Sequence, residues 1–253
     1  ADVYADHTKV RAINFVGKYF KCRGPLNCVP PVNGRPTFVQ AGGSPRGRQF
    51  AAETADCIIA VGSSTAAMKA YRDDVRARAA AAGRDPDDIK VLFLATPVIG
   101  ATRAAAEAEL DAYVSDPSYC VKTLASVSSV TDIDFSQYDL DEELPPLTTN
   151  GEQGSLDAFA QWGSGKTLRQ LCIDRATRGQ TGMAGTPDQV AARMGEIMDE
   201  VGGDGFLISS PFHKINRKYI LEVCEGLVPA LQRLGLTRAA YSATTLRETL
   251  REL

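Results

Sequence analysis

The sequence is poor in metal-binding side chains and has no pattern typical of a disulfide-rich domain. Only two histidines, His7 and His213, occur in 253 residues, and they lie far apart in the chain. The six cysteines are scattered and include no Cys-x-x-Cys pair. In a chain of this length, such cysteines are typical of reduced thiols, many of them in the core, and not of a disulfide framework or a zinc site. We therefore expect no metal site.

Long apolar runs and an excess of basic charge are also missing. No run reaches the roughly 20 apolar residues that a membrane-spanning helix needs, and residues 1–6 show neither the charged nor the apolar region of a secretory signal. Lys and Arg number 28 against 31 Asp and Glu, which gives a formal net charge of -3. No dense basic stripe is present. We therefore expect no nucleic-acid partner, no membrane partner and a cytoplasmic location.

The most informative stretch is residues 36–47, which we expect to be a strand that runs into a tight turn and a helix start. Residues 37–39 favour a pleated backbone, and the glycines at 42–43 permit a tight turn or a close approach of the backbone to a ligand. Ser44 is a good N-cap, and Pro45 fits the first helical position. Free N–H groups at such a helix start bind anions such as phosphate. An ordinary strand-to-helix loop without a ligand is the alternative.

Strands and helices alternate along much of the chain. After the first strand, we expect apolar strands at 57–61, 89–95 and 206–210, and helices at 45–54, 65–82, 102–114, 186–201 and 220–234. Such alternation with short connections is typical of βα units around a parallel sheet. Strands that are apolar throughout fit a parallel sheet that is covered on both faces.

The alternation stops between residues 116 and 185. This part is rich in serine and acidic residues, and we expect a long irregular insertion. Inside a compact α/β domain, such an insertion is often an active-site lid, with a surface decoration as the alternative. The catalytic residues are unknown, and the candidates are Tyr138 in the insertion and His213 after the last strand, which would supply hydrogen bonds to a ligand. A lone histidine in a polar loop is more often simply solvated.

Residues 160–167 satisfy a relaxed Walker A pattern, in which Lys166 would neutralise phosphates and Thr167 would hold a magnesium ion. The pattern requires a buried strand before it, whereas residues 156–159 have the character of a short helix or loop. We also find no hydrophobic run that ends in a second, metal-holding aspartate. A glycine turn followed by a helix at 168–176 is therefore favoured over a nucleotide-hydrolysing site.

Several motifs, spread over nearly the whole chain, together resemble a known family. They lie at residues 17–20, 23–27, 34–36, 39–42, 44, 133–136, 150–151, 167–169, 185–191, 204–206 and 228–232. The sequence resembles the C-terminal half of the bacterial luciferase-like flavin monooxygenases. Within them it is similar to the branch of nitrilotriacetate monooxygenase, dibenzothiophene-sulfone monooxygenase and long-chain alkane monooxygenase.

The resemblance implies an α/β fold in which residues 1–253 form strands five to eight of a (β/α)8 barrel. The insertion, at about 116–185, would be a lid between strands seven and eight. The resemblance also implies reduced FMN (FMNH2) from a separate flavin reductase, which reacts with O2 to a flavin C4a-peroxide that oxygenates a small organic substrate. The implied phosphate-binding residues are Gly42, Gly43, Ser44, Arg46 and Gly47.

A closed barrel needs eight strands, and the sequence predicts only about four of them. Half a barrel would leave open sheet edges and an uncovered core. We therefore expect an oligomer in which a second chain supplies strands one to four, or else a fragment of a longer protein. A non-catalytic flavin-binding or scaffolding half-barrel that completes a partner chain is the alternative function.

Overall fold

The computed structural model describes residues 5–29, 31, 34–160, 165–178, 182–211 and 216–252. The chain forms two compact units, residues 1–36 and 37–253. In the first unit, β1 (Phe15–Val16) and β2 (Lys21–Cys22) form an antiparallel pair. The side chains of both strands are exposed, so this pair has no apolar core of its own.

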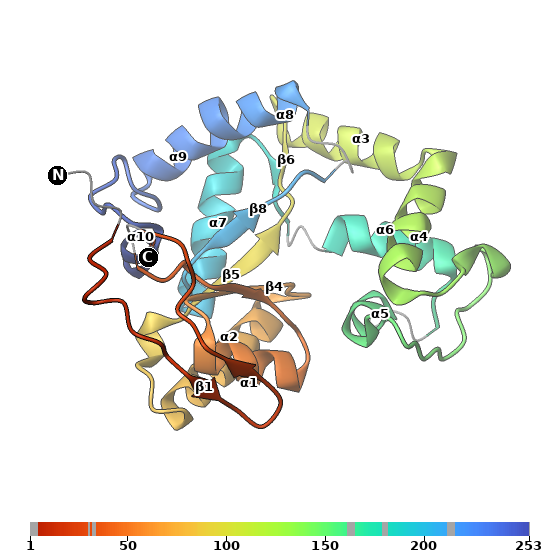
Figure 1. The fold of residues 1–253 in the computed structure, drawn as a ribbon. Coiled ribbons are helices and arrows are strands. Elements are labelled where there is room, and N and C mark those ends of the chain that lie inside the picture. Colours follow the sequence, from red (N-terminus) through yellow and green to blue (C-terminus); the bar gives the residue numbers. More distant parts are fainter. Residues whose placement is uncertain are drawn as a thin grey trace. The chain divides into compact units, whose positions relative to one another are not determined.

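The second unit is built on a four-stranded parallel sheet with the strand order β3-β4-β5-β8. The strands are β3 (Val39–Ala41), β4 (Cys57–Ala60), β5 (Lys90–Ala95) and β8 (Phe206–Ile208). Ile58 pairs with Val91, and Phe93 pairs with Phe206. The predicted parallel α/β sheet is therefore confirmed, and Figure 1 shows the helices that alternate with its strands.

Helices cover one face of this sheet, among them α1 (Pro45–Thr54), α2 (Thr65–Ala81) and α7 (Pro187–Val201). Each of these three starts after a capping side chain, namely Ser44, Ser64 or Thr186. The core between sheet and helices is one cluster of buried side chains, which includes Ile58, Ala60, Val91, Phe93 and Ala95 from the strands and Ala52, Met68, Val75, Val190 and Ile197 from the helices.

The other face of the sheet is apolar and only partly covered. Successive side chains of a strand alternate between faces, so the residues between the core positions point away from the three helices. Val39 is 51% exposed and Leu207 is 38% exposed, whereas Ile59, Leu92 and Leu94 are half-buried. We call these five residues the open face. We expected a sheet that is covered on both faces, but the helices in the described part of the chain cover only one of them.

The helix predicted at 220–234 is in fact a helix with a π-helical middle. It consists of α8 (Arg217–Leu221), η3 (Glu222–Leu227) and α9 (Val228–Arg233). The N–H of Val228 donates to the carbonyl of Val223, five residues back. Pro229 has no N–H to continue the α-helical ladder, which is a common cause of such irregularity. After a connecting segment, α10 (Leu246–Arg251) follows.

The long insertion leaves and rejoins the sheet domain at a short pair of parallel strands, β6 (Val98–Ile99) and β7 (Ala184–Gly185). Between them lie α3 (Arg103–Val114), α4 (Pro117–Thr131), the short η2 (Phe135–Gln137), α5 (Gln153–Ala160) and α6 (Leu168–Arg178). The expectation of an irregular segment at 116–185 is therefore wrong for most of its length.

The insertion also has a hydrophobic core of its own. Asp116 caps α4 by accepting a hydrogen bond from Ser118 N, and Pro117 occupies the first helical position. Cys120, Leu124 and Val127 then recur at helical spacing and are buried. Ser126, Ser128 and Ser129 flank Val127 and obscure this pattern in the sequence. Aromatic and aliphatic side chains of η2, α5 and α6 complete the cluster, including Phe135, Phe159, Leu168 and Leu171.

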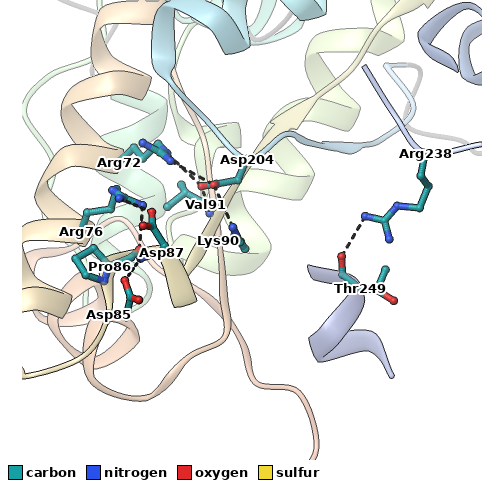
Figure 2. A network of polar contacts seen from close by, with 10 residues as sticks. All are labelled: Arg72, Arg76, Asp85, Pro86, Asp87, Lys90, Val91, Asp204, Arg238 and Thr249. Carbon is teal, nitrogen blue, oxygen red and sulfur yellow. Dashed lines mark hydrogen bonds and ion pairs between the residues drawn. The ribbon is translucent and has the colours of Figure 1, made fainter. Parts of the chain in front are cut away.

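A buried carboxylate links α2, β5 and the segment before β8 (Figure 2). Asp204 accepts hydrogen bonds from Arg72 Nε at 3.2 Å and from the backbone N–H of Val91 at 2.9 Å. Lys90 Nζ lies 4.0 Å from the same carboxylate. The side chains of Asp204 and Lys90 are only 6% and 8% exposed. Removing one partner from such a buried group of charges is costly, because the others then lack compensation.

The Asp204→Asn substitution should lower the free energy of unfolding by about 3–5 kcal/mol, because the buried Lys90 and the largely buried Arg72 would lose the carboxylate that faces them. Urea denaturation followed by circular dichroism measures this change. Asp73→Asn is a suitable control, since the Asp73–Lys69 ion pair is exposed and exposed pairs contribute little. Equal denaturation midpoints for the two variants would contradict the role assigned to Asp204.

Candidate functional site

The carboxyl ends of the four parallel strands meet at one edge of the sheet. The loops that leave this edge start at Gly42, Val61, Thr96 and Ser209, after β3, β4, β5 and β8. In α/β sheets and barrels, ligands bind at this edge. The candidate site is therefore built on these loops, and the loop after β3 together with the first turn of α1 contains all five residues predicted to bind a phosphate.

The loop after β3 has the geometry that the sequence predicts. Ser44 Oγ accepts a hydrogen bond from the N–H of Gly47 at 3.1 Å, and Pro45 occupies the first position of α1. A Cβ atom at Gly42 would lie 3.3 Å from Gly47 Cα, so a side chain at this position would crowd the turn. At Gly43 a Cβ would meet nothing within 4 Å. The loop is thus closely packed on one side and open on the other.

The donor groups of this loop fit a phosphate. In the described part of the chain, the backbone N–H groups of Gly43, Ser44 and Arg46 have no acceptor. The side chain of Arg46 is exposed and forms no ion pair with a described residue. Phosphates are bound by backbone N–H groups at helix starts and by guanidinium groups. Residues 42–47 offer both kinds of donor within one turn.

Two further side chains, which sequence analysis does not single out, hold this loop from behind. Tyr71 Oη donates to the carbonyl oxygen of Gly42 at 2.5 Å, and Arg48 Nε donates to that of Gly43 at 2.8 Å. The Arg48 guanidinium also lies over the Tyr71 ring, 4.5 Å from its centroid. Arg48 lies one helical turn after the N-cap Ser44, and this spacing could have indicated from the sequence that its side chain reaches the loop. Tyr71 lies in the next helix, and no local pattern points to it.

Arg48 is in turn held by an ion-pair network between α1 and α2. Its guanidinium lies 3.1 Å from Asp74, and Asp74 also accepts a hydrogen bond from Arg78 at 2.9 Å. Arg78 donates to the side chain of Gln49 in α1 at 3.1 Å. Although burial opposes ionisation of Asp74, the hydrogen bonds from Arg78 and Arg48 lower its pKa below the ordinary value. The network therefore keeps its charges at neutral pH.

Tyr138, the first catalytic candidate, lies in the insertion beside a cavity of about 320 Å³. The cavity is lined by Gln137, Tyr138, Asp139, Glu142, Glu143, Leu144, Pro145 and Leu168. All of these residues belong to the insertion. The structure therefore associates Tyr138 with the insertion's own cavity and not with the loop after β3. His213, the second candidate, lies outside the described residues.

The Walker-like segment does not have the structure of a phosphate-binding loop. Residues 161–164 lie outside the described part, but the helix α5 precedes them where a strand is required. The ammonium group of Lys166 contacts the carboxylate of Asp174. Thr167 Oγ1 accepts a hydrogen bond from the N–H of Gln170 at 3.3 Å, at the start of α6. The helix predicted at 168–176 is confirmed, and nucleotide hydrolysis has no support at this segment.

The cysteines are free thiols in both buried and exposed positions. Cys57, Cys120 and Cys172 are buried, and Cys22, Cys28 and Cys224 are exposed. Burial raises the pKa of the Cys57 thiol to about 11, so this group is protonated at neutral pH. Across the described residues, no group of three His, Cys, Asp or Glu side chains could hold a metal ion. No described helix is both long and apolar enough to cross a membrane.

Known proteins of similar sequence and structure are nearly twice as long as this chain, which covers 53–56% of their length. Dibenzothiophene-sulfone monooxygenase of Rhodococcus erythropolis is 32% identical over 258 aligned positions, which cover 99% of this chain and 56% of the enzyme. The crystal structure of DmoA from Hyphomicrobium sulfonivorans superposes with a TM-score of 0.81 at 30% identity. The superposition covers 100% of this chain and 53% of DmoA.

A riboflavin lyase, solved with modified FMN and riboflavin, also has a TM-score of 0.81, at 28% identity over 99% of this chain and 55% of the lyase. The chain thus spans little more than half the length of these relatives. The sequence profile of the family described as luciferase-like monooxygenase matches residues 5–205. The resemblance seen in the motifs is confirmed: this chain belongs to the luciferase-like monooxygenase family.

Proposed function

We propose that the loop formed by Gly42, Gly43, Ser44, Arg46 and Gly47 binds the phosphate of FMN. The observation that carries this proposal is the set of backbone N–H groups without an acceptor at the start of α1, beside the exposed guanidinium of Arg46. Family membership supports FMN as the source of the phosphate, since one of the similar structures contains modified FMN.

We further propose that the chain is part of a flavin-dependent monooxygenase. The enzyme would receive reduced FMN from a separate reductase and oxygenate a small organic substrate with O2. Reduced FMN, when bound, supplies the electrons that activate oxygen. The task of this chain is then to hold the cofactor by its phosphate, to orient it and to help exclude water. The names of relatives such as dibenzothiophene-sulfone monooxygenase support this reaction class.

We also propose that strands β3, β4, β5 and β8 are strands five to eight of a (β/α)8 barrel. The helices on one side of the sheet and the apolar open face on the other support this proposal, because a barrel has helices outside and packed side chains inside. The remaining strands would come from a second chain or from another part of a longer one. The insertion, which leaves the domain after β5 and returns before α7, would be the lid between strands seven and eight.

The Arg46→Ala substitution should weaken FMN binding about tenfold or more, because the phosphate would lose a charge-assisted hydrogen bond. Riboflavin, which lacks the phosphate, should bind equally well to both forms. Flavin fluorescence titrations of the purified chain give both dissociation constants.

Arg103→Ala is the matched control for this substitution. Arg103 is also an exposed arginine in the first turn of a helix, α3, but this helix follows β6 and not β3. Its loss should leave FMN affinity unchanged. Equal effects of the two substitutions, or equal losses of FMN and riboflavin affinity in the Arg46 variant, would contradict the proposed phosphate site.

Catalysis is tested by oxygen uptake with a flavin reductase, NADH, FMN and candidate substrates such as sulfones. A monooxygenase should give substrate-dependent oxygen uptake and an oxygenated product, and the Arg46→Ala variant should need more FMN for the same rate. Flavin binding without product formation over a broad substrate panel would instead favour a scaffolding half-barrel.

The open face should bind apolar dyes when the chain is isolated. Leu207 in β8 and Leu221 in α8 are both 38% exposed, which makes them a matched pair. The Leu207→Lys substitution should reduce the fluorescence of bound anilinonaphthalene sulfonate more than Leu221→Lys, because only Leu207 lies on the continuous apolar sheet face. Equal reductions would argue against this face as the interior of a barrel.

A further inference from the structure

The loop after β3 relies on two anchors because its central residues are glycines. Glycine has more freedom in φ and ψ than any other residue, so a glycine pair does not hold one conformation by itself. In this loop both glycine carbonyls are held from outside: that of Gly42 by Tyr71 Oη at 2.5 Å, and that of Gly43 by Arg48 Nε at 2.8 Å.

Holding these carbonyls also sets the direction of the next two N–H groups. The C=O of one residue and the N–H of the following residue share one planar peptide unit and point in opposite directions. The bond to the Gly42 carbonyl therefore orients the N–H of Gly43, and the bond to the Gly43 carbonyl orients the N–H of Ser44. These are two of the three N–H groups in the loop that have no acceptor in the described structure.

The anchors are themselves held firmly. Tyr71 is only 7% exposed, and its ring meets that of Phe93 edge-on, with 6.1 Å between centroids. Arg48 is fixed by the Tyr71 ring below it and by Asp74, 3.1 Å away. Burial raises the pKa of Tyr71 to about 12, so its hydroxyl remains a donor at neutral pH. Both anchors thus connect the loop to the packed core between α1, α2 and the sheet.

We propose that Tyr71 and Arg48 are positioning residues that aim the N–H groups of Gly43 and Ser44 at the phosphate of FMN. The inference rests on the proposed function of this loop. Neither side chain needs to touch the cofactor: each acts through the peptide unit that it holds. Donors that are oriented before binding do not have to be ordered at the moment of binding, which raises affinity.

The Tyr71→Phe substitution should weaken FMN binding about five- to tenfold, because it removes the bond to the Gly42 carbonyl and keeps the packed ring. Riboflavin affinity should stay the same, since the loop contacts only the phosphate. Hydrogen–deuterium exchange of peptides that cover residues 42–47 should also become faster. Fluorescence titration with FMN and riboflavin, together with exchange measured by mass spectrometry, gives these readouts.

Tyr119→Phe is the matched control. Tyr119 is also a buried tyrosine whose hydroxyl donates to a backbone carbonyl, that of Cys172 at 3.1 Å, but it lies in the core of the insertion. Its loss should leave the preference for FMN over riboflavin unchanged. A second variant, Arg48→Lys, keeps the positive charge but not the planar guanidinium, and it should also reduce this preference.

The outcomes separate this inference from the proposal on which it rests. A wild-type chain that binds FMN no better than riboflavin would overturn the phosphate site itself, and the positioning role with it. A wild type that prefers FMN, combined with Tyr71→Phe and Arg48→Lys variants that match the Tyr119→Phe control, would overturn the positioning role alone. Equal losses of FMN and riboflavin affinity, as a merely structural role would give, would overturn it as well.

Discussion

The buried carboxylate of Asp204 holds together three parts of the sheet domain that are far apart in the chain. It binds Arg72 of α2, accepts the N–H of Val91 in β5, and lies two residues before β8. A second buried carboxylate, Asp56, binds the N–H of Phe38 at 2.8 Å before β3. Both lie near the amino ends of the parallel strands. Charge is therefore buried and compensated at this end of the sheet.

At the carboxyl ends of the strands, by contrast, polar groups are left without partners among the described residues. There the loop after β3 presents N–H groups that have no acceptor in the described residues, next to the exposed Arg46. In α/β barrels the amino ends of the strands serve stability and the carboxyl ends serve binding. This division means that the donors of the loop need not contribute to stability. The loop is held from behind by the hydrogen bonds that Tyr71 and Arg48 donate to its glycine carbonyls.

Local signals in the sequence were sufficient for most of the sheet domain. Ser44 and Pro45 mark the start of α1, and Thr186 with Gln189 forms the capping box of α7, as the residue types alone predict. The contacts of Asp204 could not be predicted in this way, since Arg72 is 132 positions away in the sequence. The same holds for Tyr71 and Gly42. Contacts between residues so far apart in the chain depend on tertiary packing and cannot be predicted from a local sequence pattern.

The insertion was the least predictable part, because polar residues lie among its apolar positions and its core forms within itself. Its two ends are nevertheless fixed side by side: Val98 N donates to Met183 O, and Gly100 N donates to Gly185 O, both at 2.9 Å. When the ends of a segment are already joined, the entropy of closing it depends only weakly on its length. The insertion can therefore be lengthened or exchanged at little entropic cost while the sheet and the loop after β3 stay as they are.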